Sequence, residues 1–292
     1  MAEEAGLAAP RRRSVQCLSP KGLHRIAYLE WGDPRNREVV VCVHGLTRTA
    51  RDFDDLARSL CGRFRVVCPD VVGRGDSDRL ADPALYALPQ YLADMVTLVA
   101  RLDVEAVSWV GTSMGGLIGM ALAAQPGSPV RRAVLNDIGA VVGHAGLERI
   151  GANLGKAPPF ASLDEAEAYV RRVCAPFGPH SDEQWRHLAQ TWVRKSDAGY
   201  LASYDPRIAE PFFAAFPEKD IDLWPLYDAM RCPTLVLRGE RSDLLSRETA
   251  VEMARRGPRA RVVEIAGVGH APTLMQADQV AAVRNFLEES SP

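Results

Sequence analysis

A serine between two glycines, at the junction of an apolar run and a small-residue run, is the feature that most constrains how this chain folds. The residues Gly111-Thr112-Ser113-Met114-Gly115 follow the apolar run 107–110 and precede 117–124, a run rich in alanine and leucine. A strand that turns sharply into a helix at such a serine is the sequence form of a nucleophile elbow, which projects the hydroxyl from the top of a sheet. Gly111 and Gly115 have no Cβ, so the chain can pass close to itself at this turn.

Strand-like and helix-like segments alternate on both sides of the turn. Apolar runs at 39–43, 65–70, 132–137, 233–239 and 261–265 are separated by helix-like segments at 52–60, 90–102, 247–256 and 276–288. This alternation predicts an α/β fold with a mostly parallel sheet flanked by helices. Residues 24–31 alternate apolar and polar side chains, which is typical of an antiparallel strand.

The alternation stops between residues 139 and 230. This stretch has no strong strand pattern, and it combines helix-like segments at 163–173 and 182–192 with many prolines and aromatic residues. We therefore predict an inserted helical cap over 139–230 and a core formed by 14–138 and 231–292. Residues 1–13 are expected to form a flexible N-terminal tail.

The composition excludes several classes of partner. The 292 residues carry 35 basic and 37 acidic side chains, a net charge of −2 that gives no reason to expect a nucleic-acid partner. We see no apolar stretch long enough for a membrane span, and residues 1–6 have no apolar signal-peptide region. We therefore expect a cytoplasmic protein with no membrane partner.

The cysteines and most histidines give no sign of a metal site. The six cysteines form no C-x-x-C pair, and several lie in apolar runs, which favours small core residues in a reducing compartment. His24, His144, His180 and His187 lack the spacing of metal ligands, so we expect them at solvated surface positions. We expect no metal ion and no cofactor.

Four short motifs, in order along the chain, resemble those of the α/β-hydrolase superfamily. They are His44-Gly45, Gly73-Arg74-Gly75-Asp76-Ser77, the turn at Ser113, and the late pair Asp243 and His270. The resemblance runs from about residue 15 to 287 and is strongest to the cap-bearing bacterial serine hydrolases, which include esterases, lactonases and carbon–carbon hydrolases. It implies an α/β-hydrolase sheet with an inserted helical cap.

The resemblance also implies a catalytic triad. Ser113 is the expected nucleophile, His270 its base and Asp243 the acid that orients the imidazole, in the family's order of serine, acid and histidine. Asp137 is the alternative acid, because some members of the family take the acid after an earlier strand. Glu240 is a lesser rival to Asp243.

The backbone N–H groups of Leu46 and Met114 are the expected oxyanion hole, by resemblance, with Gly45, Gly111 and Gly115 in supporting positions. His44 competes with His270 as a base. In the family, however, the histidine at that position braces the oxyanion loop.

A serine at the turn argues against haloalkane dehalogenase and epoxide hydrolase chemistry, whose enzymes use aspartate there. We expect a hydrolase of small carboxylic esters, lactones or thioesters that forms an acyl-enzyme on Ser113. Its partner is then a small-molecule acyl substrate. Two alternatives stay open: a carbon–carbon hydrolase of ring-cleavage diketones, with Arg186 or Arg194 over the active site, and a ligand-binding relative without catalysis.

Overall fold

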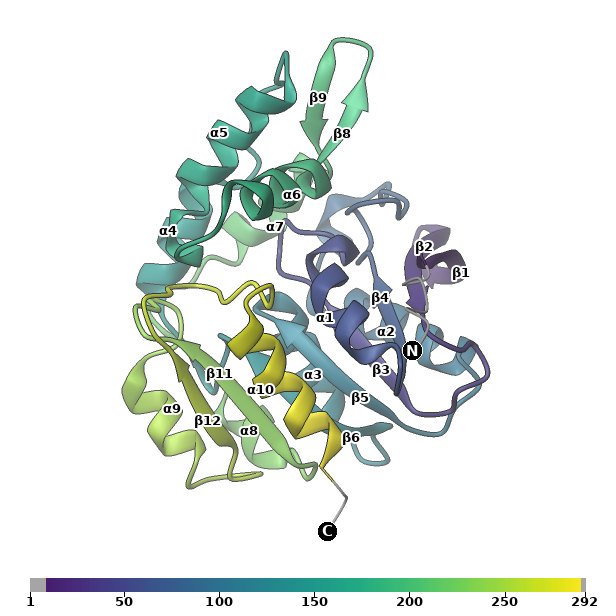
Figure 1. Ribbon diagram of the computed structural model, residues 1–292, viewed down its shortest axis with the longest axis vertical. Helices are drawn as coiled ribbons and strands as arrows, with labels where there is room; N and C mark the ends of the chain where they lie inside the picture. The colour runs from purple at the N-terminus through teal and green to yellow at the C-terminus, as the bar shows by residue number, and fades with distance from the viewer. Residues whose placement is uncertain (1–8, 290–292) are drawn as a thin grey trace, which may run out of the picture.

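The computed structural model describes residues 9–289 and contains an eight-stranded sheet at its centre (Figure 1). The strand order is β1-β2-β4-β3-β5-β6-β11-β12. The strands are β1 (Arg11–Ser19), β2 (Gly22–Trp31), β3 (Val39–Val43), β4 (Arg65–Pro69), β5 (Val107–Thr112), β6 (Val130–Asn136), β11 (Thr234–Gly239) and β12 (Arg261–Ile265). From β4 to β12 all neighbours pair in parallel, whereas β2 pairs antiparallel with both β1 and β4. The predicted α/β class and mostly parallel sheet are confirmed.

The first strand begins earlier than the sequence suggested. Arg11 and Arg13, which we assigned to the tail, lie in β1 opposite Glu30 and Tyr28 of β2. The Nε of Arg11 donates a 3.1 Å hydrogen bond to the buried carboxylate of Glu30. These ion pairs order a segment whose arginines alone gave no strand signal. Residues 1–8 of the predicted tail lie outside the described residues.

Helices cover both faces of the sheet. One face carries α1 (Asp54–Leu60) and α10 (Ala277–Glu288), and the other carries α2 (Leu88–Arg101), α3 (Met114–Ala123), α8 (Trp224–Ala229) and α9 (Arg247–Met253). All five residues of β3 are buried, with Val40 and Cys42 in one apolar cluster and Val39, Val41 and Val43 in the other. A parallel strand between two helical layers needs apolar side chains on both faces, which explains its continuous apolar run.

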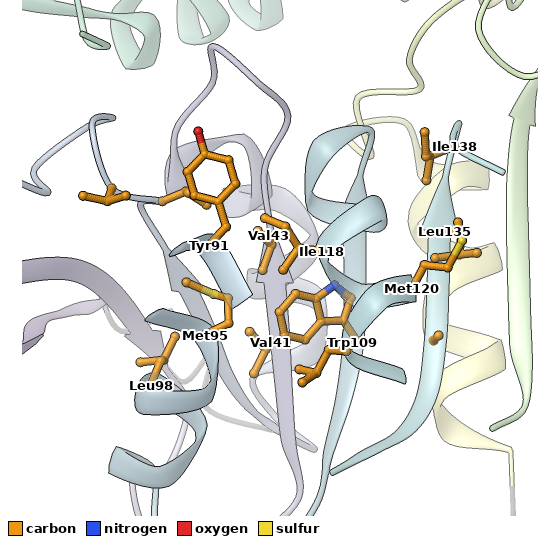
Figure 2. Close-up of a cluster of buried hydrophobic side chains, with 14 of the residues drawn as sticks. Val41, Val43, Tyr91, Met95, Leu98, Trp109, Ile118, Met120, Leu135 and Ile138 are labelled. Carbon is orange, nitrogen blue, oxygen red and sulfur yellow. The ribbon is translucent and has the colours of Figure 1, made fainter. Parts of the chain in front are cut away.

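Trp109 of β5 holds α3 against the sheet (Figure 2). Its indole is fully buried next to Ile118 and Met120 in the same cluster, and its Nε1 donates a 2.9 Å hydrogen bond to the carbonyl of Gly115. A Cβ on Gly119 would lie 2.3 Å from the indole, so only glycine allows this approach. The small residues of α3 therefore place the helix directly behind the turn at Ser113.

A group of helices and a hairpin lie above the sheet in Figure 1, and we refer to them as the upper group. They are α4 (His144–Asn153), α5 (Leu163–Val173), α6 (Asp182–Trp192), α7 (Ala209–Ala214) and the antiparallel strands β8 (Val193–Ser196) and β9 (Gly199–Ala202). The sequence of this region shows no strong strand pattern, because β8 and β9 are short and β8 carries mostly polar side chains. A further two-stranded pair joins β7 (Val141–Val142) to β10 (Ile221–Asp222).

Aromatic side chains pack inside the upper group. Tyr169 of α5 stacks on Trp192 of α6 with ring centroids 5.5 Å apart, and Phe160 lies 5.3 Å from Tyr169. The N-terminus of α6 is closed by a capping box of Ser181 and Gln184. The clustered aromatics of the sequence thus serve mainly to pack these helices. Within residues 9–289, no helix has the length and hydropathy of a membrane span.

Candidate active site

Ser113 lies at the turn between β5 and α3 in a strained backbone conformation. Its φ is 52° and its ψ −116°, which is rare for a residue with a Cβ. A Cβ on Gly111 would lie 2.3 Å from the backbone of Gly115, and a Cβ on Gly115 would lie 1.9 Å from the carbonyl oxygen of Val43. Gly111 therefore allows the tight turn itself, and Gly115 allows the turn to lie against β3.

The hydroxyl of Ser113 is hydrogen-bonded to His270, and His270 is hydrogen-bonded to Asp137. The Ser113 Oγ is 2.9 Å from Nε2 of the imidazole, and Nδ1 is 2.8 Å from Oδ2 of Asp137. Asp137 follows the end of β6, and His270 follows β12. His270 is 7% exposed and Asp137 is fully buried, so water competes little for this chain of hydrogen bonds.

Donors from the end of β11 and the loop after it hold the carboxylate of Asp137. The backbone N–H of Gly239 donates to Oδ1 at 2.7 Å, and the hydroxyl of Ser242 donates to Oδ2 at 2.6 Å. The backbone N–H of Asp137 itself donates to the Leu237 carbonyl at 2.8 Å. β11 and its loop therefore fix both the backbone and the carboxylate of Asp137.

Asp243 does not contact His270, which corrects the expectation that Asp243 orients the imidazole. Its carboxylate accepts hydrogen bonds from Nε and Nη2 of Arg149 at 2.6 and 2.8 Å. Burial acts to raise the pKa of Asp243, but the hydrogen bonds from Arg149 and the attraction of its charge together lower that pKa. The imidazole contacts Asp137, which the sequence analysis kept as the alternative acid. β6 and β11 are neighbours in the sheet, so Asp137 and Asp243 both lie at the edge formed by the carboxyl ends of the strands. Arg149 of α4 forms an ion pair with Asp243 and leaves Asp137 to bond His270.

Glu240 is also turned away from the imidazole, because its carboxylate accepts a 2.7 Å hydrogen bond from the backbone of Gly267. His44 is fully buried and braces the loop beside Ser113. Its Nε2 accepts a 3.0 Å hydrogen bond from the backbone of Val71, so Nδ1 carries the proton and donates to the Gly45 carbonyl at 2.7 Å. Burial lowers the pKa of His44 to about 4.

Two backbone N–H groups flank Ser113. Met114 is the first residue of α3, where an N–H has no partner within the helix. Leu46 lies in the loop after β3, and both Gly45 and Leu46 line the same cavity as Ser113. A Cβ on Gly45 would lie 3.7 Å from the Cβ of Ser113, so this loop runs directly against the serine.

Arg74 contacts both Leu46 and Met114, a role that was not predicted from the sequence. Its side chain is 1% exposed; Nε donates to the Leu46 carbonyl at 2.9 Å, and Nη2 lies 3.5 Å from Sδ of Met114. Nη1 donates to the Val72 carbonyl and to the Tyr91 hydroxyl. In the sequence, Arg74 stands out only as an arginine inside the glycine-rich motif 73–77. Its neighbours along the chain do not indicate that the side chain extends to Leu46 and Met114.

A cavity of about 150 Å³ opens beside Ser113 and His270. Its upper wall comes from α4, α5 and α6 and is mostly apolar, with Ile150, Val170, Leu188 and Trp192 among the lining residues. Two guanidinium groups also line it, those of Arg48 and Arg149. A cavity of this volume holds a molecule of about the size of benzene.

Arg186 and Arg194, the candidates for a guanidinium over the site in the carbon–carbon hydrolase alternative, both lie elsewhere. Arg186 pairs with Asp164 and Glu167 of α5, and Arg194 is exposed on β8. Neither residue lines the cavity. Arginines are common and point in every direction on a helical layer, so sequence alone could not choose among them.

His24 is buried rather than solvated. Its Nε2 lies 3.0 and 3.1 Å from the two carboxylate oxygens of Asp94, and Cys17 is close enough to complete a group of three potential metal ligands. The short distances from nitrogen to oxygen are those of a direct hydrogen bond. Of the other histidines, His180 is half-buried and bonds the hydroxyl of Thr273 at 2.8 Å.

Comparison with known proteins gives the same family throughout. The model of the alpha/beta hydrolase family matches residues 40–283. The chain is 51% identical over 287 residues to the 3-hydroxybutyrate-oligomer hydrolase of Cupriavidus necator, covering 96% of this chain and 98% of that protein. It is 30% identical to the 2-hydroxymuconate semialdehyde hydrolase of a Pseudomonas species, covering 77% of each.

A solved structure agrees with these sequence relatives. The crystal structure of an alpha/beta hydrolase from Novosphingobium aromaticivorans superimposes with a TM-score of 0.86 at 41% identity, covering 97% of this chain and 99% of the other. Because the family model covers residues 40–283 and a hydrolase is 51% identical over nearly the whole chain, this chain belongs to the alpha/beta hydrolase family.

Proposed function

We propose that this protein is a serine hydrolase that cleaves short carboxylic esters through an acyl-enzyme on Ser113. The observation that carries the proposal is the continuous series of hydrogen bonds from Ser113 through His270 to Asp137. A serine hydroxyl is a weak nucleophile at neutral pH and needs an adjacent base. The imidazole lies within hydrogen-bond distance of the hydroxyl, as such a base must.

In the proposed first half-reaction, His270 removes the proton of Ser113 while Oγ attacks the ester carbonyl. The negative charge that develops on the carbonyl oxygen is met by the N–H groups of Leu46 and Met114. His270 then gives its proton to the departing alcohol, which leaves an acyl-enzyme on Ser113. In the second half-reaction, His270 activates a water molecule that releases the acid.

Asp137 is the positioning acid in this scheme. Its Oδ2 accepts from Nδ1 of His270, so Nε2 is left unprotonated and faces Ser113. When the imidazole becomes charged, the fixed carboxylate stabilises it. The Gly239 and Ser242 hydrogen bonds keep the carboxylate in place without protein movement.

The substrate class is proposed from the cavity and from the 51% identical relative. That relative is named for hydrolysis of 3-hydroxybutyrate oligomers, which are esters of a short hydroxy acid. The small apolar cavity fits one short acyl unit better than a long chain. We also propose that the upper group is the cap predicted for 139–230, with α8 excepted, because α8 packs against α3 of the core.

The test is turnover of nitrophenyl esters of increasing acyl length by the purified protein, beside the Ser113→Ala variant. We expect fastest turnover for the shortest acyl groups, fluorophosphonate labelling of the wild type, and loss of both in the variant. A ring-cleavage diketone in the same panel tests carbon–carbon hydrolysis. Absence of turnover and of labelling would sink the enzyme proposal and favour a ligand-binding relative.

A further inference from the structure

Two arginines from separate parts of the chain line the cavity in the same manner. Arg48, in the loop after β3, uses Nε and Nη2 to bond the carboxylate of Asp52 at 2.6 to 3.0 Å. Arg149, on α4, uses the same edge of its guanidinium to bond Asp243. Each pair fixes the plane of the guanidinium and leaves Nη1 outside the ion pair.

Arg48 differs from Arg149 in its burial. The Arg48 side chain is 7% exposed, and its Nη1 has no hydrogen-bond partner among residues 9–289. The Arg149 side chain is 33% exposed, so water can satisfy its free N–H groups. A buried donor without a protein partner is costly, so we expect a bound water, ion or ligand to supply its acceptor.

The positive charge of the guanidinium favours an anion as that acceptor. Arg48 and Arg149 line the cavity, and each is paired with one aspartate, Asp52 or Asp243. Of the two, Arg48 is the one with a buried N–H that no carboxylate in the described part of the chain occupies, and a carboxylate makes a stronger hydrogen bond to such a group than a neutral oxygen does. Burial acts to lower the pKa of Arg48, but Asp52 outweighs it and raises that pKa, so the guanidinium stays charged.

We propose that Arg48 binds a free carboxylate of the substrate, so that the preferred esters are those of short hydroxy acids whose leaving alcohol ends in a carboxylate. This inference rests on the proposed ester hydrolysis and names its substrate class. The apolar wall of the cavity contacts the hydrocarbon part of the substrate, and Nη1 of Arg48 donates a hydrogen bond to its carboxylate.

The experiment compares two substrates that differ only at that end. The first is the linear dimer of 3-hydroxybutyrate with its free carboxylate, and the second is the same dimer capped as the primary carboxamide. We expect the wild type to favour the acid over the amide by about tenfold to a hundredfold in kcat/KM, the range of one charged hydrogen bond. An equal rate for both dimers overturns the inference.

The variant Arg48→Gln removes the charge and is expected to lose most of this preference. Arg48→Lys keeps a charge and should retain part of it, and Arg48→Gln with Asp52→Asn avoids an unpaired carboxylate. The matched control is Arg51→Gln, which removes another arginine paired with an aspartate, Asp54, at a position outside the cavity lining. The control should keep the acid preference of the wild type.

Binding gives a second readout. Free 3-hydroxybutyrate should inhibit turnover of nitrophenyl butyrate competitively, and its inhibition constant should rise about tenfold or more in Arg48→Gln. If Arg149→Gln abolishes the acid preference while Arg48→Gln retains it, the carboxylate belongs to Arg149 and the assignment to Arg48 fails. Turnover of nitrophenyl butyrate with no acid preference overturns the carboxylate site alone, whereas no turnover of any ester overturns the proposed function.

Discussion

Nδ1 of His270 lies 2.8 Å from Oδ2 of Asp137. Asp243 forms no hydrogen bond with His270, because its carboxylate is paired with Arg149. Asp137→Asn should therefore lower kcat by roughly 10⁴-fold, because an amide favours the wrong imidazole tautomer. Asp243→Asn is the matched control and should cost less than about tenfold. Steady-state kinetics on one nitrophenyl ester measures both, and a larger loss in Asp243→Asn would reverse the assignment.

Arg74 should act on turnover through Leu46 and Met114. Arg74→Met removes the hydrogen bond to the Leu46 carbonyl, so the loop that carries the proposed oxyanion N–H of Leu46 is held less firmly. We expect kcat to fall about 100-fold with a smaller change in KM, because a misplaced donor acts mainly in the transition state. Arg74→Lys should recover part of the loss. Equal kcat in wild type and Arg74→Met, with the fold intact by circular dichroism, would contradict this role.

Gly119 should tolerate no side chain. Gly119→Ala places a Cβ 2.3 Å from the Trp109 indole, so the helix behind Ser113 must shift. We expect a loss of about 1–3 kcal/mol in the free energy of unfolding, despite the better helix propensity of alanine. Gly62→Ala is the control, because a Cβ there meets nothing within 4 Å. Urea denaturation of both variants measures the difference, and equal midpoints would count against the packing argument.

His44 should make stability depend on pH. Burial lowers its folded pKa to about 4, below its ordinary value of 6.5, so the unfolded chain binds the proton more readily between these values. The stabilisation is complete above pH 6.5 and is lost as the pH falls toward 4. Between pH 7 and 4.5 this amounts to about 2 kcal/mol.

The comparison with His44→Gln isolates that contribution. Asp70, whose pKa burial raises to about 6, acts in the opposite direction over part of this range, and it is common to both proteins. Urea unfolding at pH 7 and pH 4.5 should show the wild type losing about 2 kcal/mol more than the variant. Equal losses in both proteins would rule out His44 as the source.

Local sequence predicted the elements that depend on short-range chemistry. The run 39–43 is apolar throughout because its strand is covered on both faces. Gly111 is required by contacts within the turn, whereas Gly115 is required by the close approach of Val43 on the neighbouring strand β3. The upper hairpin β8–β9 was missed because short, partly exposed strands have little apolar signal. Arg11 was missed because it is ordered by an ion pair with Glu30 at the far end of the neighbouring strand β2, which a local pattern does not reveal.

The sequence by itself determined the turn at Ser113, the mostly parallel sheet and the order of the motifs, because each rests largely on neighbouring residues and on periodic burial. Only the tertiary structure decided which aspartate meets His270. Asp137 and Asp243 follow adjacent strands and end at the same edge of the sheet, so their positions along the chain do not separate them. Arg149, on a helix outside the sheet, takes one carboxylate, and Ser242 and Gly239 hold the other against the imidazole. Such a choice depends on long side chains from distant elements, whose directions are set by packing and electrostatics rather than by local pattern.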